Sequence, residues 1–278
     1  MSAAGGHDGR DRTRIAGQAP AQSVVPRAVV GPTDGTRYER IRSGATTVVG
    51  RADLMPALLQ TTASGTAHEW AAAQPDRRTF QGRLATYAVQ LPLDGPAVVV
   101  RRNHHGGALA RLRGDRFFYP RAARELSIAR HLRDEGIATP EVVGIVVYHD
   151  SWFSRRSDVI TRELPSGHDL GAFLRADPSA ADRAAAWDAV ASLLHALATV
   201  GAWHADLNVK NIHLSVTDAQ WTAAVLDVDR ITLGEPGIIV GQANRQRLLR
   251  SIAQWERLHG VRVSDEERAV LRVREAAA

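Results

Sequence analysis

The amino-acid sequence predicts an α+β protein with two unlike lobes and a cleft between them. Residues 38–162, the N-lobe, hold short apolar runs broken by turn residues, which is typical of an antiparallel sheet. Residues 163–278, the C-lobe, hold long stretches with apolar residues at helical spacing, which indicates a mainly helical lobe. The pattern changes near Pro165. Two units of different architecture favour a binding site where they meet.

The strands of the N-lobe are predicted from four apolar segments. The runs LATYAVQL (84–91) and AVVVR (97–101) are separated by the turn sequence DGP, which predicts a β-hairpin. The runs VVGIVVYHD (142–150) and SDVITREL (157–164) are expected to form further strands. Residues 1–37 lack periodicity and are rich in Ala, Gly, Arg, Asp and Pro, so a mobile tail is expected before the first lobe.

One helix is predicted between these strands. The stretch 121–136 places Leu126, Ala129 and Leu132 on one face and ends at Gly136. A helix here would connect the hairpin to the next strand and could pack one apolar face on the sheet.

The C-lobe is predicted to contain two long helices with short strands between them. Residues 181–200 carry an apolar stripe, and residues 242–258 form a basic helix. Strand character appears around residues 211–214 and 224–226, whereas the sequence LPSGHDL at the start of the lobe interrupts any regular pattern. The stripe of the first helix consists of Trp187, Val190, Leu194 and Leu197.

Composition excludes several classes of protein. With 44% hydrophobic residues in 278, the chain can bury a core, so global disorder is excluded. The absence of cysteine excludes disulfides, thiolate metal sites and a cysteine nucleophile. No apolar stretch reaches the roughly 18 residues of a spanning helix, and the N-terminus lacks the apolar core of a secretory signal, so a cytoplasmic protein is expected. Lys210 is the single lysine among 35 basic residues, and any other cationic role must fall to arginine.

The most informative stretch is HADLNVKN, residues 204–211. It places the carboxylate of Asp206 five residues before the carboxamide of Asn211. A second carboxylate, Asp227, follows within the apolar sequence VLDVD, where an unpaired charge is costly and a cation is a favourable partner. Asn211 and Asp227 offer the hard oxygen ligands that suit Mg²⁺ bridging phosphates. Asp206 remains available to accept a hydroxyl proton.

The run HADLNVKN followed by LDVD resembles the catalytic loop and the metal motif of protein kinases. More narrowly, HADLN, VVVRRNHHGG and LDVDR resemble the lipopolysaccharide core kinases, which include kinases of 3-deoxy-D-manno-octulosonic acid (Kdo). The resemblance extends from about residue 79 to residue 251. It implies a protein-kinase-like bilobal fold that uses ATP and Mg²⁺ to phosphorylate a sugar of the lipopolysaccharide inner core.

The resemblance also implies roles for individual residues of the C-lobe. Asp206 would orient or deprotonate the acceptor hydroxyl, and Asn211 and Asp227 would hold Mg²⁺. His204 would support the loop from within the structure. Lys210, four residues after Asp206, would lie near the transferred phosphate.

In the N-lobe, the resemblance assigns Gly82 and Arg83 to a loop that covers the nucleotide, although no G-x-G-x-x-G motif is present. Residues 161–165 (TRELP), with Glu163 at the centre, would form the hinge that holds the adenine through backbone groups.

The N-lobe has no lysine, so the usual strand lysine of kinases must be replaced. Arg101 at the end of AVVVR is the best replacement, and Glu125 on the following helix is its expected partner. Arg102 is the alternative for the phosphate contact, because the alternation of the strand decides which arginine points inward. Glu125 could alternatively be a plain surface residue of the helix.

A basic segment predicts the kind of acceptor. Between residues 101 and 130 there are eight arginines against Asp115 and Glu125, a local net charge of +6 that exceeds the +5 of the whole chain. Such a segment attracts polyanions, and Kdo-lipid A carries phosphates and a carboxylate. The aromatic residues 117–119 could contact lipid, so we expect a location peripheral to the cytoplasmic face of the inner membrane.

Two rival functions remain from the sequence. The chain could be another kinase of this fold that acts on a small molecule or a protein. It could also be a non-catalytic module that binds a membrane or nucleic acid, but a nucleic-acid partner is not expected, because binding it would not require Asp206, Asn211 and Asp227 in this order.

Two details stay open as well. Asp229 could be a second metal ligand or a partner of Arg230. A stripe of three arginines on the basic helix could form a solvated face or face the substrate; its members are Arg245, Arg247 and Arg250.

Overall fold

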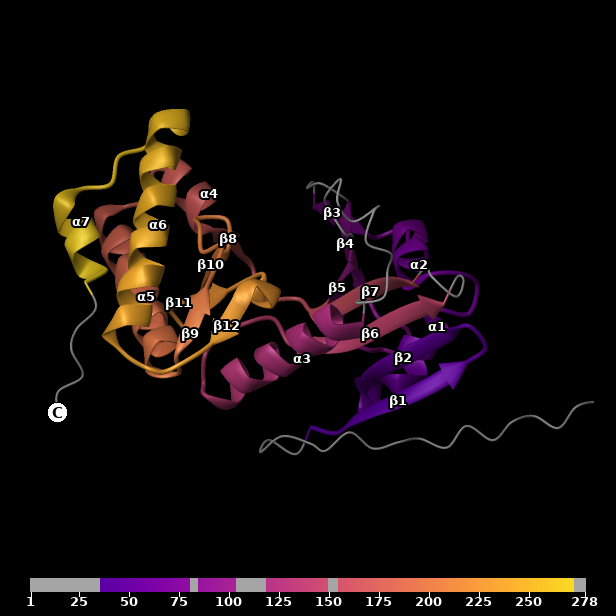
Figure 1. The fold of residues 1–278 in the computed structure, drawn as a ribbon. Coiled ribbons are helices and arrows are strands. Elements are labelled where there is room, and N and C mark those ends of the chain that lie inside the picture. Colours follow the sequence, from indigo (N-terminus) through magenta and orange to yellow (C-terminus); the bar gives the residue numbers. More distant parts are fainter. Residues whose placement is uncertain (1–35, 81–84, 104–118, 150–154, 273–278) are drawn as a thin grey trace, which may run out of the picture.

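The computed structural model describes residues 36–80, 85–103, 119–149 and 155–272. It has the two lobes that the sequence predicts, with strands gathered in the first and most helical residues in the second (Figure 1). The loop with Gly82 and Arg83, residues 1–35 of the expected tail, and residues 104–118 of the basic segment lie outside the described residues. Within the described ranges, no helix combines the length and the apolar character needed to cross a bilayer.

The N-lobe is built on a seven-stranded antiparallel sheet in the order β1-β2-β6-β7-β5-β4-β3. The predicted hairpin is present as β4 and β5, and the two later apolar runs form β6 and β7 in the centre of the sheet. The strands are β1 (Tyr38–Ser43), β2 (Thr46–Arg51), β3 (Arg78–Phe80), β4 (Thr86–Gln90), β5 (Ala97–Asn103), β6 (Val142–His149) and β7 (Arg155–Arg162).

Helices cover both faces of this sheet. On one face, α3 (Tyr119–Asp134) is the predicted N-lobe helix. On the other face lie α1 (Met55–Gln60), which follows the 3₁₀ turn η1 (Ala52–Leu54), and α2 (Ala67–Ala73). Strand β6 is buried on both sides for this reason, which explains its nearly continuous apolar sequence.

A pair of glycines lets α1 approach the sheet closely. Gly50 of β2 and Gly144 of β6 are opposite each other in the strand register. A Cβ atom at either position would collide with the side chain of Leu58, which is fully buried. The first hairpin and α1 therefore fit the sheet only because both partners lack a side chain at this point.

The C-lobe combines helices with two small antiparallel sheets. One sheet has the order β11-β10-β8, and the other pairs β12 with β9. Its helices are α4 (Leu170–Arg175), α5 (Ala180–Thr199), α6 (Ile238–His259) and α7 (Asp265–Val270). Its strands are β8 (Gly167–Asp169), β9 (Ala202–His204), β10 (Ile212–Thr217), β11 (Gln220–Val225) and β12 (Ile231–Leu233), with the 3₁₀ turn η3 (Val228–Arg230) before β12.

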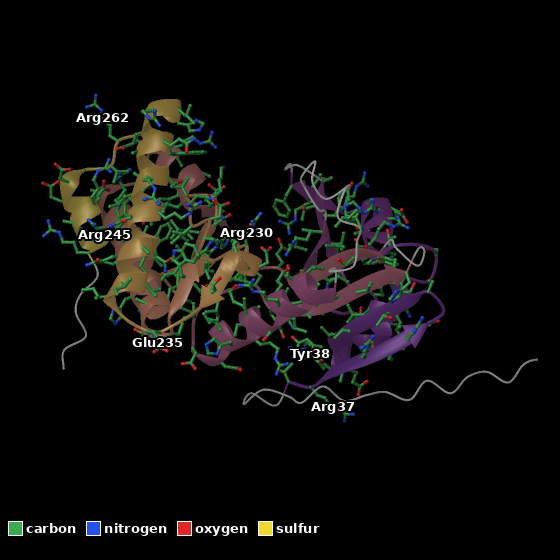
Figure 2. The ribbon with its side chains drawn as sticks, in the orientation of Figure 1. Arg37, Tyr38, Arg230, Glu235, Arg245 and Arg262 are labelled. Atoms are coloured by element: carbon green, nitrogen blue, oxygen red, sulfur yellow. The ribbon has the colours of Figure 1, made fainter. Side chains whose placement is uncertain are left out.

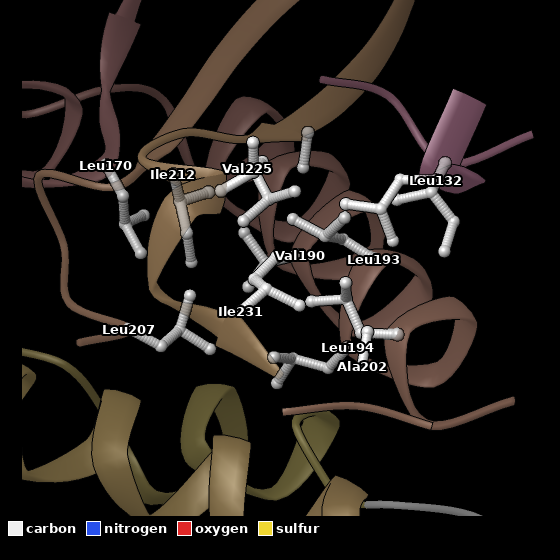
Figure 3. Close-up of a cluster of buried hydrophobic side chains, with 14 of the residues drawn as sticks. Leu132, Leu170, Val190, Leu193, Leu194, Ala202, Leu207, Ile212, Val225 and Ile231 are labelled. Atoms are coloured by element: carbon white, nitrogen blue, oxygen red, sulfur yellow. The ribbon is translucent and has the colours of Figure 1, made fainter. Parts of the chain in front are cut away.

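One hydrophobic core joins the C-lobe to α3. Figure 3 shows Leu132 of α3 beside Val190 and Leu193 of α5 in a single buried cluster. The guanidinium of Arg124, also on α3, donates a hydrogen bond of 2.8 Å to the carbonyl of Ile231 at the start of β12. Apolar contact and a hydrogen bond therefore both fix α3 against the C-lobe.

A buried carboxylate ties three strands of the N-lobe together. Glu141, just before β6, accepts hydrogen bonds from Arg51 of β2 (2.5 Å) and from Arg162 at the end of β7 (2.8 Å). Burial works to raise the pKa of Glu141, but the hydrogen bonds from Arg162 and Arg51 outweigh it and hold the pKa below its usual value. The stabilising contribution is therefore present above the pKa of the unfolded chain, about 4.3, and is lost as the pH falls through the lower pKa of the folded state.

We expect Glu141→Gln to lower the free energy of unfolding by about 1–3 kcal/mol at pH 7, because two charged hydrogen bonds lose their anion. The loss should shrink as the pH falls below about 4. Urea unfolding across this pH range measures it, with Glu135→Gln on the exposed end of the same lobe as the control. An equal loss at both ends of the range would contradict the assignment.

Candidate active site

The loop after β9 is organised around a buried histidine. His204 is fully buried; its Nε2 lies 3.0 Å from the carbonyl of Leu226, and its Nδ1 accepts a hydrogen bond from the backbone N–H of Asp206. These contacts define one tautomer, with the proton on Nε2. Burial lowers the pKa of His204, which favours the neutral ring that this arrangement needs. The structure thus places His204 inside, where the sequence expected a supporting residue.

Asp206 and Asn211 are held together through the loop backbone. The side-chain amide of Asn211 donates a hydrogen bond of 2.8 Å to the carbonyl of Asp206, and the amide of Asn208 donates to the same oxygen at 2.9 Å. Because the amide nitrogen of Asn211 is used in this way, its side-chain oxygen is the atom left to act as a ligand. The carboxylate of Asp206 itself is half exposed.

Asp227 is brought to the same place by the strand before it. The N–H of Leu226 donates a hydrogen bond of 2.9 Å to the backbone carbonyl of Asn211, so the residue after it follows directly beside the loop. Asp227 has left-handed backbone angles, φ 58° and ψ 42°, which turn the chain from β11 into η3. Aspartate tolerates this conformation better than most residues. The structure therefore gathers Asp206, Asn211 and Asp227 at one junction.

Across from this junction, Arg101 of β5 forms an ion pair with Glu125 of α3. The Glu125 side chain is 4% exposed, so the alternative of a plain surface residue is wrong. Burial raises the pKa of Glu125, and the guanidinium of Arg101 opposes that shift. The charges of Asp227 and Asp229 also act on Arg101. Helix α3, which carries Glu125, packs against η3, the turn that follows Asp227. Glu125 Oε2 has no hydrogen-bond partner among the described residues.

The choice between Arg101 and Arg102 follows from the alternation of β5. Arg102 points to the other face of the sheet, where its guanidinium lies 3.4 Å from the hydroxyl of Thr66 and 3.5 Å from the carboxylate of Glu69 at α2. Arg101 is therefore the arginine that faces α3 and the C-lobe.

Two other predicted site residues have their side chains engaged elsewhere. Lys210 donates to Asp169 at 3.1 Å, and its Nζ lies 4.9 Å from the centre of the Trp255 ring. The carboxylate of Glu163 binds Arg78 of β3, and the backbone N–H of Glu163 donates to the carbonyl of Ala97 at 3.0 Å. Glu163 thus tethers the chain that links the lobes to the sheet edge.

The sequence did not predict that α6 holds the loop. Asn244 is fully buried; its side chain accepts from the N–H of His204 at 3.0 Å and donates to the carbonyl of Ala202 at 2.9 Å. One turn later, Arg247 binds the carboxylate of Asp206 at 2.9 Å, and after another turn Ser251 accepts from the N–H of Val209.

A signal for this contact is present in the sequence. Asn244 lies at the same helical positions as Leu248 and Ile252, and a polar residue on a buried stripe requires a polar partner. Of the four arginines on α6, Arg247 is the one that binds the carboxylate of Asp206. Figure 2 labels Arg245 on the same helix.

The donor set at the junction fits a magnesium ion. Within the described ranges, no group of three or more histidines and carboxylates gathers as a metal cage. Asn211 and Asp227 instead offer one amide oxygen and one carboxylate, and Mg²⁺ in phosphotransferases is held by one or two such groups together with substrate phosphates and water. These two residues could hold the ion in this way.

Comparison with known proteins agrees with this geometry. The sequence profile of the lipopolysaccharide kinase (Kdo/WaaP) family matches residues 70–272. The chain belongs to this family. The matched region contains the loop after β9, Asp227 and the pair formed by Arg101 and Glu125. The kinase-like bilobal fold and the kinase activity expected from the sequence are those of the family.

Several relatives and solved structures are similar to this member of the family. A 3-deoxy-D-manno-octulosonic acid kinase of Pasteurella multocida is 26% identical over 163 residues, which cover 56% of this chain and 67% of the relative. One of Stenotrophomonas maltophilia is 27% identical over 202 residues, covering 70% and 76%. The solved structure of WaaP in complex with acyl carrier protein aligns over 76% of this chain and 83% of that one, with 17% identity and a TM-score of 0.47.

We expect Asn244→Ala to lower the free energy of unfolding by about 2–4 kcal/mol, because the buried N–H of His204 and the buried carbonyl of Ala202 both lose their partner. Urea unfolding measures the change. The control is Gln246→Ala, an exposed position on the same helix, which should change stability by less than about 0.5 kcal/mol. A loss as small as that of the control would show that the two backbone groups find other partners.

Proposed function

We propose that this kinase transfers a phosphoryl group from ATP to a hydroxyl of Kdo on lipid A, in the synthesis of the lipopolysaccharide inner core. The proposal depends on one observation above all: Asp206, Asn211 and Asp227 meet at a single junction, beside the ion pair of Arg101 and Glu125. If the loop after β9 were only an ordinary turn, it would need neither the guanidinium of Arg101 in the N-lobe nor the half-exposed carboxylate of Asp206.

The residues of the chain divide the work of the reaction. The carboxylate of Asp206 accepts the proton of the acceptor hydroxyl as the new oxygen–phosphorus bond forms and the bond to the bridging oxygen of ADP breaks. Arg101, fixed by Glu125, offers a planar fork to phosphate oxygens. A magnesium ion held by Asn211 and Asp227 would neutralise phosphate charge when bound.

An arginine can replace the lysine of other kinases here because the role is electrostatic. Phosphoryl transfer is promoted chiefly by positioning and by charges placed where the phosphate oxygens lie. Arg101 has a buried carboxylate on one side and can present its remaining N–H groups to the nucleotide. The Arg101 side chain is 26% exposed, so it is not sealed off from solvent.

The acceptor and the location of the protein are inferred from chemistry and from the names of its relatives. The relatives above are kinases of 3-deoxy-D-manno-octulosonic acid, a sugar acid. The eight arginines between residues 101 and 130 suit an anionic lipid. Because the acceptor would be anchored in a bilayer and ATP is cytoplasmic, we place the enzyme at the cytoplasmic face of the inner membrane, in peripheral contact.

Purified protein incubated with MgATP and Kdo-lipid A should produce a phosphorylated product, detected by mass spectrometry. Asp206→Asn should lower the rate at least about 100-fold, because the carboxylate that accepts the proton is lost. The fold should persist, as judged by circular dichroism, since the Asp206 side chain is half exposed.

The matched control is Asp188→Asn, an exposed carboxylate on α5, which should leave the rate unchanged. The proposal is contradicted if Kdo-lipid A is not phosphorylated while a peptide or an aminoglycoside is. It is also contradicted if Asp206→Asn keeps the full rate.

A further inference from the structure

One face of α6 contacts the site at successive turns, and one of these contacts differs from the rest. Asn244 and Ser251 bind backbone groups of residues 202, 204 and 209, and the indole of Trp255 donates to the carbonyl of Gly171. These contacts already fix the path of the loop. Arg247 lies on the same face but binds a functional side chain, the carboxylate of Asp206. Positioning the loop therefore does not account for Arg247.

The contact leaves most of the guanidinium unused. Among the described residues, the one hydrogen bond of the Arg247 side chain runs from Nη2 to Oδ1 of Asp206; Nε is buried without a partner, so the 37% of the side chain that is exposed lies outside Nε. The strongest pairing between arginine and a carboxylate uses two parallel hydrogen bonds, and a guanidinium carries five donors. Both side chains are partly exposed, Arg247 at 37% and Asp206 at 51%, and a single contact of this kind is weak. The guanidinium can therefore bind a second anion at little cost.

We propose that Arg247 recognises an anionic group of the acceptor, a carboxylate or a phosphate next to the reacting hydroxyl, and so makes the enzyme selective for acidic sugars. This inference rests on the proposed phosphotransfer. A hydroxyl within hydrogen-bond distance of Asp206 brings the rest of its sugar ring beside the guanidinium, 2.9 Å from the same carboxylate. A charged hydrogen bond there is about twice as strong as a neutral one, and the guanidinium stays charged at any physiological pH.

The test compares Kdo-lipid A with its carboxyl methyl ester, which removes the negative charge of the sugar acid and keeps its hydroxyls. For the unaltered enzyme, KM for the acid should be about tenfold to a hundredfold lower than for the ester, the range expected for a charged hydrogen bond. In Arg247→Gln, KM for the acid should rise by that factor and the discrimination between acid and ester should vanish. Arg247→Lys, which retains the charge, should keep part of the discrimination.

The control is Arg250→Gln, an exposed arginine one turn further along α6, which should keep the full discrimination. If Arg247→Gln slows acid and ester equally, Arg247 only positions Asp206 and the inference is wrong. It is also wrong if the variant mainly weakens binding of MgATP, measured directly by calorimetry. Should the unaltered enzyme phosphorylate neither acceptor, the proposed function fails first, which is a distinct result. If Arg247→Gln does not fold, Arg247→Lys against Arg250→Gln decides the question.

Discussion

The site depends on the contact between the buried amide of Asn244 and the backbone on either side of Trp203. This one side chain satisfies the N–H of His204 and the carbonyl of Ala202 at once, in a region closed to water. The ring of His204 in turn accepts a hydrogen bond from the N–H of Asp206 and contacts the carbonyl of Leu226, the residue before Asp227. A single helix position therefore sets the relation between Asp206 and Asp227, because each link is a hydrogen bond of 2.9–3.1 Å to the buried His204 or Asn244.

The second constraint acts across the lobes. The carboxylate of Glu125 is buried, and a buried charge persists only when it is paired, here with Arg101. On helix α3, Glu125 binds Arg101 of the N-lobe sheet. On the same helix, Arg124 binds the start of β12 and Leu132 packs in the C-lobe core. The orientation of the arginine in the N-lobe thus depends on the same helix that joins the two halves. Figure 1 shows α3 between the strands of the N-lobe and the strands β9 and β12 of the C-lobe.

Residue patterns were sufficient to predict the elements whose signal is local. Two kinds of local pattern were enough. Apolar runs bounded by turn residues predicted the hairpin β4–β5 and the central strands β6 and β7, and apolar residues at helical spacing predicted the long helices α3, α5 and α6. Strand β8 was missed because Gly167, His168 and Asp169 have no such pattern and are strand only through pairing with β10. The first hairpin and α1 were also not predicted, since their position depends on a distant glycine, Gly144.

The same distinction applies to the site. The stretches HADLNVKN and VLDVD are recognisable in the sequence, and they contain Asp206, Asn211 and Asp227. Arg101 could be paired with Glu125 because the chain has no lysine before residue 210. Arg247 is some 40 positions from its partner, and the four arginines of α6 are equivalent until the helix is placed. Only the rotation of α6, which the buried Asn244 fixes, separates Arg247 from the other three.

The solitary lysine has a practical consequence. Lys210 is half exposed and its ammonium lies over the indole of Trp255, next to the loop that carries Asp206. Amine-directed reagents would find one side chain in the whole sequence to modify, without any engineered cysteine. A dye attached there would sit within reach of the indole of Trp255, which can quench it, and beside the loop that carries Asp206.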